Sequence, residues 1–360
     1  MAMVSAVISA KPAVRSGDRR IRARQTIAGL AALLTFVFIA SLTVGASGTS
    51  LFEALMHWAA GEEIGLRERV ILFDIRLPRA VMGVAVGAAL AVSGAVMQGL
   101  FRNPLADPGL VGVGTGAGLG AILAIVLGGF LPPAIAAITG TFTVPLAAFL
   151  GGWVTTLLLY RVATRNGRTS VAVMLLAGIA LGALAGAISG VLVYMADDQQ
   201  LRDLTFWGLG SLAGATWTKV LVAMPLILLA LAVAPFLARG LNGLTLGEAA
   251  AGHLGIPVQR MKNIAILTVA GATGAAVAVS GGIGFIGLVV PHILRLAIGP
   301  DHRYLLPAAA LLGASLLLGA DMISRTIIAP AELPIGIVTA TIGGPFFLYI
   351  LLRNRGILDM

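Results

Sequence analysis

The sequence predicts an all-α polytopic membrane protein with about ten transmembrane helices. Of its 360 residues, 58% are hydrophobic and only 11% are charged. The mean hydropathy is +1.00, and water-soluble globular domains do not normally show such values. The apolar residues form long runs that are nearly free of charge, and about 20 such residues cross the hydrocarbon core of a bilayer.

The first expected helix is the apolar run from Ile27 to about Gly45, which follows a basic tail at residues 1–26. A cleaved signal peptide has the same order of charge and hydrophobicity. This run is longer than the apolar region of a signal, however, and no small-residue cleavage pattern followed by a soluble sequence appears. We therefore expect a retained helix, with residues 27–360 forming a single transmembrane domain. The nine further expected helices cover residues 79–101, 109–128, 134–160, 171–195, 217–237, 261–280, 284–298, 304–328 and 334–353.

Two longer polar segments, residues 47–78 and 196–216, are expected outside the membrane. The second is amphipathic and carries aromatic residues typical of the membrane interface. On the side of the amino terminus, the tails and loops carry 17 Lys and Arg residues, against 7 on the opposite side. The positive-inside rule therefore places both termini in the cytoplasm. The net charge of +9 is assigned to this orientation, and nucleic-acid binding is not expected.

A tetrapeptide, Ala-Val-Ser-Gly, occurs at residues 91–94 and again at 278–281. The copies fall in the second and seventh expected helices, five spans apart, so the two halves would cross the membrane in opposite directions. Inverted repeats with Gly- or Pro-interrupted helices are typical of transporters. We expect the repeat halves at about residues 79–195 and 261–353.

The chain has no evident energy source of its own. It contains no Cys and therefore no thiolate metal site, and it lacks the Gly-rich phosphate loop of ATPases. Ionisable residues are almost absent from the helix interiors. Asp321 is the main candidate for an ion-coupling site, and pairing with Arg325 one turn later is the favoured interpretation of that residue. An integral membrane enzyme is disfavoured because no His and carboxylate cluster has helical spacing. These observations indicate a solute pathway that is driven by a separate motor subunit.

The expected cytoplasmic loop at residues 239–260 is a candidate contact for such a motor. It is expected to contain a short helix, with Thr245 as its cap and Glu248 completing a capping box. Gly252, Gly255 and Pro257 then break that helix. Small and apolar residues are exposed where an ordinary solvated loop would be charged, which favours a docking segment for an ATPase.

From Ile71 to Arg353 the chain resembles the permease subunits of type II ABC importers, which take up iron–siderophores, haem and cobalamin. The motifs that carry the resemblance are Ile75–Arg79, Gly87–Gln98, Arg102–Gly109, Gly284–Arg295 and Glu332–Pro345. The resemblance implies a homodimer in the bacterial inner membrane, with two ATPase subunits on the cytoplasmic side and a periplasmic binding protein outside. ATP and Mg²⁺ would be bound by the ATPase, so neither a cofactor nor a metal is expected in this chain.

The resemblance also implies roles for individual residues. Arg76, Arg79 and Arg325 match positions that receive acidic residues of the binding protein, and exposed guanidinium groups would orient such a partner. The alternative for each is an arginine that extends to the membrane interface.

Two further groups lie on the cytoplasmic side. The gate residues implied by the resemblance are Asn103 and Leu105 in one turn and Thr169 and Ser170 in another. The coupling residues that would contact the ATPase are Glu248, Ala249, Gly252, His253, Leu254 and Gly255. His253 is expected to be a surface or contact residue rather than a metal ligand, because no second ligand has suitable spacing.

His292 is expected to be a packed or capping residue rather than a haem ligand. Met97, Met174 and Met195 could line an apolar path, although methionine more often fills gaps between helices.

Haem is the first expected cargo, because a mostly apolar sequence offers few fixed charges for a polar siderophore. Siderophores and cobalamin remain the alternatives within the family. The rival from another class is a secondary transporter that uses Asp321 as its proton or cation site.

Overall fold

The computed structural model describes residues 16–45, 56, 60–61, 65–165 and 168–353. The first 15 residues of the basic tail and much of the expected 47–78 segment lie outside the described residues. The long helices are α1 (Ser16–Thr43), α4 (Leu77–Leu100), α5 (Val113–Leu127), α7 (Thr143–Ala163), α8 (Val171–Met195), α10 (Trp217–Leu244), α12 (Val258–Ser280), α13 (Ile286–Ile298), α14 (His302–Thr326) and α15 (Ile335–Arg353). The short helices are α3 (Leu66–Arg69), α6 (Pro133–Thr139), α9 (Asp198–Leu209) and α11 (Glu248–His253), and a hairpin pairs β1 (Thr164–Arg165) with β2 (Arg168–Thr169).

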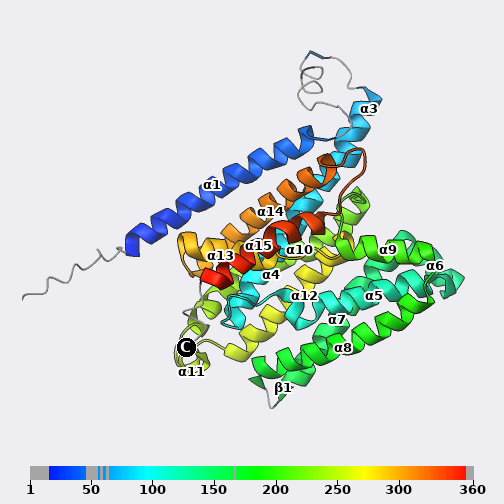
Figure 1. Ribbon diagram of the computed structural model, residues 1–360. Coiled ribbons are helices and arrows are strands. Elements are labelled where there is room, and N and C mark those ends of the chain that lie inside the picture. The colour runs from blue at the N-terminus through cyan, green and yellow to red at the C-terminus, as the bar shows by residue number, and fades with distance from the viewer. Residues whose placement is uncertain (1–15, 46–55, 57–59, 62–64, 166–167, 354–360) are drawn as a thin grey trace, which may run out of the picture.

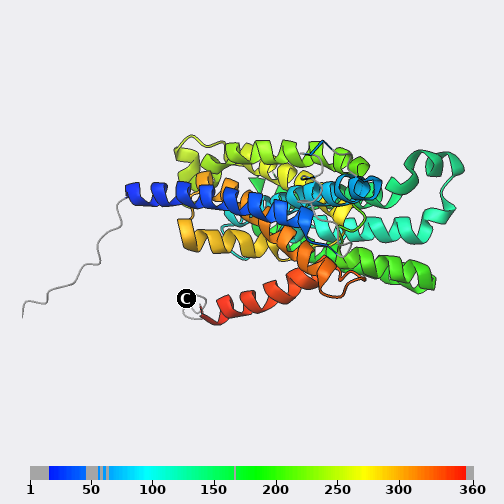
Figure 2. The same ribbon diagram turned by 90° about the horizontal axis from the view of Figure 1, so that it is seen from above.

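The described helices form a bundle with two distinct ends (Figure 1). The start of α1, the hairpin, α11 and the end of α15 lie at one end, while α3, α6 and α9 lie at the other. Eight described helical segments are long and apolar enough to cross a membrane, and α13 and α15 contain two shorter apolar stretches. Figure 2 shows the long helices running roughly side by side, as a spanning bundle requires. The all-α polytopic prediction is confirmed.

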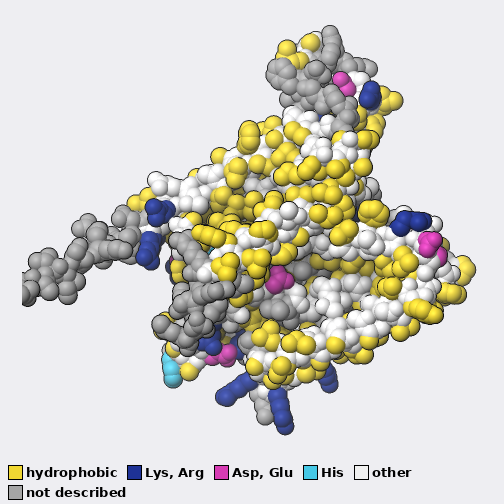
Figure 3. Space-filling view, viewed as in Figure 1, with side chains coloured by type: hydrophobic (Ala, Val, Ile, Leu, Met, Phe, Trp, Pro, Cys, Tyr) yellow, Lys and Arg dark blue, Asp and Glu magenta, His cyan; other side chains and the backbone are white. Residues whose placement is uncertain are grey.

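A band of hydrophobic side chains covers the visible flank of the bundle between its ends (Figure 3). Lys and Arg side chains gather around the start of α1 and around the hairpin. The end that holds the described chain termini is therefore the more basic one, and we call it the inner end. The end with α3, α6 and α9 is called the outer end.

Four expected boundaries were wrong. Helix α1 begins at Ser16 rather than at Ile27, so part of the expected basic tail is helical. The chain becomes helical at Leu66, and a π-helix at Val70–Arg76 continues into α4, so Arg76 does not belong to a loop. The expected helix at residues 134–160 is divided into α6 and α7, because Gly140 has a positive φ of 49°. Helix α10 continues to Leu244, which shortens the expected loop at residues 239–260.

Helix α4 is the central helix of the bundle and is buried along almost its whole length. Small residues allow this. A Cβ atom on Gly94 would overlap the backbone carbonyl of Gly287 in α13, and one on Gly87 would overlap that of Gly313 in α14. Helices in lipid gain from such close approach because van der Waals packing, rather than water exclusion, drives their association.

The two Ala-Val-Ser-Gly copies have different backbone environments. Gly94 is helical in the middle of α4, whereas Gly281 follows the last residue of α12 with a φ of +70°. The tetrapeptide therefore does not mark equivalent structural positions. The inverted repeat itself stays a prediction.

Replacing Gly94 by alanine should loosen the contact between α4 and α13. The added methyl group meets backbone rather than a flexible side chain, so we expect a loss of about 1–3 kcal/mol of stability. Thermal unfolding in detergent measures the effect. Gly118→Ala in α5 is the matched control, because nothing lies within 4 Å of its added Cβ. Equal unfolding temperatures for both variants would contradict this packing account.

Candidate functional site

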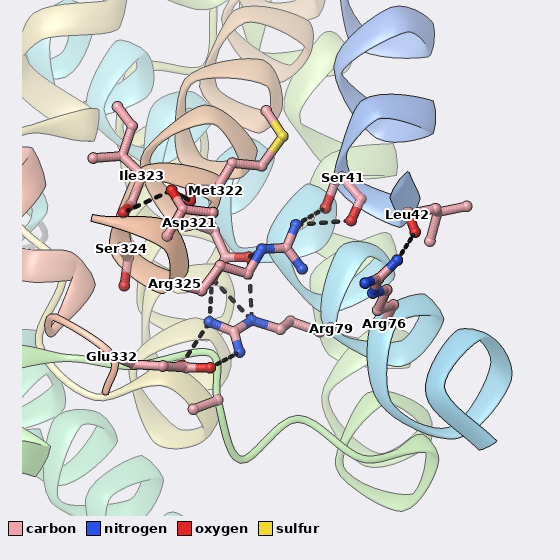
Figure 4. A network of polar contacts seen from close by, with 12 residues as sticks. Ser41, Leu42, Arg76, Arg79, Asp321, Met322, Ile323, Ser324, Arg325 and Glu332 are labelled. Carbon is pink, nitrogen blue, oxygen red and sulfur yellow. Dashed lines mark hydrogen bonds and ion pairs between the residues drawn. The ribbon is translucent and has the colours of Figure 1, made fainter. Parts of the chain in front are cut away.

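At the outer end, a buried ion cluster joins α4 to α14 and to the segment after α14 (Figure 4). The Nε of Arg79 donates to Asp321 Oδ1 at 3.0 Å, and its Nη2 donates to the same oxygen at 2.8 Å. The Arg79 Nη1 and Nη2 atoms also donate to the two carboxylate oxygens of Glu332 at 2.8 and 2.9 Å. The side chains of Arg79 and Asp321 are 7% and 1% exposed, and that of Glu332 is 37% exposed. One guanidinium group thus binds two carboxylates in the fork geometry that favours strong pairing.

Two neighbouring arginines bind the last carbonyl groups of α1. The Nη1 of Arg76 donates to the carbonyl oxygens of Leu42 and Thr43 at 2.6 and 3.1 Å. The Nη2 of Arg325 donates to the carbonyl oxygen of Ser41 at 2.8 Å and to its hydroxyl at the same distance. These carbonyls have no partner within the helix, and the carboxyl end of a helix favours positive charge. The arginines therefore anchor α1 to the bundle.

This geometry corrects the expectation that the three guanidinium groups are exposed. Arg76, Arg79 and Arg325 are 4%, 5% and 6% exposed, because each is occupied inside the protein. The expected pairing of Asp321 with Arg325 is confirmed, with Arg325 Nε and Asp321 Oδ2 3.7 Å apart. The closer partner of Asp321 is Arg79, and nothing in the sequence indicated that pairing.

The first pair of expected gate residues lies in the turn after α4. Asn103 Oδ1 accepts from the Leu105 N–H at 2.9 Å, and Asp107 Oδ1 accepts from the Gly109 N–H at 2.8 Å. Both are local side-chain turns that fix the backbone. Burial raises the pKa of the Asp107 carboxyl group above its ordinary value, although the bond from Gly109 opposes that shift.

The second pair of expected gate residues lies at the end of the β1–β2 hairpin. Thr169 is buried, whereas Ser170 is exposed and caps α8, its Oγ accepting from the Val173 N–H at 3.4 Å. The hairpin is bound to the first turn of α12 by Gln259, which accepts from the Thr169 N–H at 3.1 Å and donates to its hydroxyl at 2.7 Å. Within the described part of the chain, no hydrogen bond joins this hairpin to the turn that holds Asn103.

A buried lysine completes this inner-end cluster. Lys262, in α12, is 2% exposed. Its Nζ donates to the carbonyl oxygen of Thr169 at 3.0 Å and to Glu248 Oε1 at 2.6 Å. Glu248 is the first residue of α11. One ammonium group therefore touches both the hairpin and α11.

The expected short helix in the coupling segment exists as α11, but its capping box was wrong. The N-cap is Gly247, which has no side chain with which to cap the helix. The Thr245 hydroxyl donates to the Asn242 carbonyl, and the Glu248 carboxylate binds Lys262 rather than a backbone N–H. The chain turns between α11 and α12 and brings Glu248 next to Lys262. The Glu248 carboxylate binds this ammonium group in place of the backbone N–H that a capping box requires. The other coupling residues, Ala249, Gly252, His253, Leu254 and Gly255, are exposed.

The remaining candidates are packing residues. The ring of His292 contacts Phe346 edge to face, with centroids 6.5 Å apart, which confirms a packed histidine. Met97 and Met174 are buried, as gap-filling methionines would be, whereas Met195 is 60% exposed.

Sequence reasoning missed Glu332, Gln259 and Lys262 as members of the two clusters. The sequence did contain an indication that Lys262 has a special role, because it is one of only three lysines and lies near the start of an apolar helix. A charged residue at such a position is costly unless it has partners.

The comparisons with known proteins agree with this geometry. The sequence pattern of the FecCD transport family matches residues 33–353. The hemin transport system permease protein HmuU of Yersinia pestis is 47% identical over 336 residues, which cover 93% of this chain and 98% of that protein. The cobalamin import system permease protein BtuC of Halobacterium salinarum is 45% identical over 83% of this chain and 78% of that protein. A solved structure described as an inward-facing conformation of a metal-chelate type ABC transporter superposes with a TM-score of 0.80, at 32% identity, over 92% of this chain and 99% of that one.

Substituting Asp321 by asparagine should destabilise the outer end strongly. Removing one member of a buried ion pair leaves uncompensated charge and typically costs about 3–5 kcal/mol. We expect a lower unfolding temperature in detergent and less folded protein in the membrane. Asp203→Asn, a carboxylate on α9 with no ion pair among the described residues, is the control. Wild-type stability in the Asp321 variant would show that the cluster does not clamp the helices.

Proposed function

The chain belongs to the FecCD transport family and is the non-catalytic transmembrane permease subunit of an ABC importer, and from this premise we propose that its cargo is haem. The observation that carries the proposal is the 47% identity to a hemin permease over nearly the full length of both chains. Helix α8 supports it, because Val171–Met195 contains no Asp, Glu, Lys, Arg or His and is largely exposed in this single chain. A weakly polar surface suits a flat, mostly apolar chelate. Siderophore and cobalamin import remain the alternatives, since cobalamin permeases are nearly as similar.

The working protein in this proposal is a homodimer in the bacterial inner membrane. Both termini lie in the cytoplasm, and the inverted repeat relates two halves of each subunit. The basic inner end supports this orientation through the positive-inside rule. Two ATPase subunits bind at that end and a periplasmic binding protein at the other. A secondary transporter driven through Asp321 is not favoured, because two arginines already pair with that carboxylate.

The exposed face of α11 is the proposed ATPase contact. Ala249, Gly252, His253, Leu254 and Gly255 offer a small-residue surface, and Leu254 is 56% exposed. The turn at Asn103 and Leu105 and the hairpin at Thr169 and Ser170 are the proposed gate halves. Each would meet the gate of the second subunit on the two-fold axis.

The binding protein is proposed to dock at the ion cluster of the outer end. Because its three arginines are buried, they cannot all receive carboxylates of the partner directly. Arg76 and Arg325 are occupied by α1, and Asp321 is fully buried. Glu332 is the accessible partner of Arg79, so an incoming carboxylate would compete with Glu332 for that guanidinium group.

The function is tested by haem uptake into proteoliposomes that contain this chain and its ATPase, with haem-loaded binding protein outside. We expect ATP-dependent accumulation of haem. Leu254→Asp, which places a charge on the proposed ATPase contact, should abolish uptake and lower ATPase binding. Leu246→Asp, another exposed leucine nearby, is the control for an added charge. ATP hydrolysis stimulated by the binding protein without haem uptake would reject haem as cargo.

The docking proposal predicts that Glu332→Gln strengthens binding of the binding protein. The substitution weakens the internal competitor for Arg79, and one charge-assisted hydrogen bond is typically worth about 1.5–3 kcal/mol. Surface plasmon resonance on nanodisc-embedded permease would measure a lower Kd. Weaker binding would mean that Glu332 itself contacts the partner, and an unchanged Kd would exclude the exchange.

A further inference from the structure

Lys262 lies between α11 and the β1–β2 hairpin, which share no hydrogen bond with each other among the residues that the structure describes. Its ammonium group is 2.6 Å from Glu248 Oε1, at the start of α11, and 3.0 Å from the carbonyl oxygen of Thr169, at the end of the hairpin. The proposed ATPase contact and the proposed gate are thus bound to the same atom. We propose that Lys262 is a positioning residue that transmits movement of α11 to the hairpin and so to the gate.

The surroundings of the lysine make this connection stiff. The Lys262 side chain is 3% exposed, so both bonds lie in a partly dehydrated region where charge-assisted bonds are strong. Gln259, one turn earlier on α12, holds the other polar groups of Thr169, its N–H and its hydroxyl. The same glutamine donates to Asn263 Oδ1 at 2.8 Å, and Asn263 accepts from the Tyr160 hydroxyl in α7 at 2.6 Å. The hairpin therefore follows α12 rather than moving independently.

The two ends of the connection differ in exposure. Glu248 has a half-exposed side chain, at 50%, and lies on the element that an ATPase can reach. Thr169 is buried, and the next residue, Ser170, caps α8. A displacement at α11 therefore passes through one buried ammonium group to Thr169, two residues before α8 begins. Only 11% of the most apolar stretch of α8 is buried in this chain, and among the described long helices only α5 and α7 pack extensively against it.

A lysine suits this position better than an apolar residue would. Replacing a buried ion pair by packed apolar groups often maintains stability, so an ion pair at such a place needs a reason besides folding. Three donor hydrogens on one ammonium group allow it to hold a carboxylate and a carbonyl at once. The contacts stand on the structure alone, whereas their consequence for transport rests on the proposed function.

The first arm of the test uses the permease alone in nanodiscs. Hydrogen–deuterium exchange of the peptide covering residues 164–170 reports on the hairpin. Glu248 lies on α11 and makes no hydrogen bond to the described residues of the hairpin. We nevertheless expect Glu248→Gln to accelerate exchange of the hairpin amides about tenfold. Lys262→Met should accelerate exchange of the hairpin amides to a similar extent, whereas Lys262→Arg, which keeps the positive charge, should retain the slow exchange of the wild type. Unchanged hairpin exchange in both Glu248→Gln and Lys262→Met would overturn the inference.

The second arm uses the complex with ATPase and loaded binding protein. Lys262→Met should still assemble and hydrolyse ATP, but the haem imported per ATP should fall about tenfold. Trapping the ATPase with vanadate should change hairpin exchange in the wild type and not in this variant. Arg260→Met is the matched control, because Arg260 is an exposed cation on the same helix. A Lys262→Met complex with the wild-type ratio would also overturn the inference.

The two arms separate this inference from the proposed function. If the wild-type complex imports no haem, the cargo proposal fails, while the first arm still decides whether α11 and the hairpin are connected. If Lys262→Met fails to fold, Glu248→Gln and the Lys262→Arg variant still carry the exchange measurement. A merely structural role for Lys262 would lower stability without a selective effect on the hairpin.

Discussion

The ion cluster of Arg79, Asp321 and Glu332 is the constraint on which the outer half of the bundle depends. Charged groups inside a low-dielectric bundle are tolerated only when their partners lie within hydrogen-bond distance. Here one guanidinium group binds two carboxylates, and its neighbours Arg76 and Arg325 bind the end of α1. Helices α1, α4 and α14 are thereby fixed to one another at one level of the bundle (Figure 4).

The long helices differ widely in how much of their surface is buried in this chain. In the most apolar 18 residues of Leu66–Leu100, 89% are buried, whereas in those of Ala172–Met195 the share is 11%. The main hydrophobic core is built mostly from α4, α10, α12, α13 and α14. Helices α5, α7 and α8 add one buried residue each to it, Val113, Ala163 and Met174, and most of their other buried apolar residues lie in small separate clusters. The chain thus combines a tightly packed part with one whose surface is largely open. Such a division suits a permease, in which one set of helices must move or meet a second subunit while the other remains rigid.

The inner end has its own polar cluster, with a different arrangement. Gln259, Lys262 and Asn263 on α12 bind the hairpin, α11 and α7. Lys262 and Gln259 bind two short elements that project from the bundle, α11 and the hairpin, which is where an ATP-driven partner would act under the proposed function.

Hydrophobic run length predicted most of the fold, because the thickness of the bilayer sets the length of a spanning helix. The all-α polytopic class and the limits of α8 at Val171 and Met195 were confirmed in this way. What could not be predicted depended on contacts between distant segments. Arg79 and Asp321 are 242 residues apart in sequence, so only the fold brings them together, and the exposed arginines expected from the resemblance proved to be buried. The capping box at Thr245 failed for the same reason, since Glu248 had a stronger partner in Lys262.

The clamp at the outer end is the central claim of this account, and a double-mutant cycle tests it most directly. Arg79→Met, Asp321→Leu and the double variant would be compared by their unfolding in mixed detergent and SDS micelles. The account predicts that the double variant loses about 1–3 kcal/mol less stability than the sum of the two single losses, because neither Arg79 nor Asp321 is then left facing the other's empty place. Additive losses would contradict it, since they would mean that Arg79 and Asp321 stabilise the bundle independently.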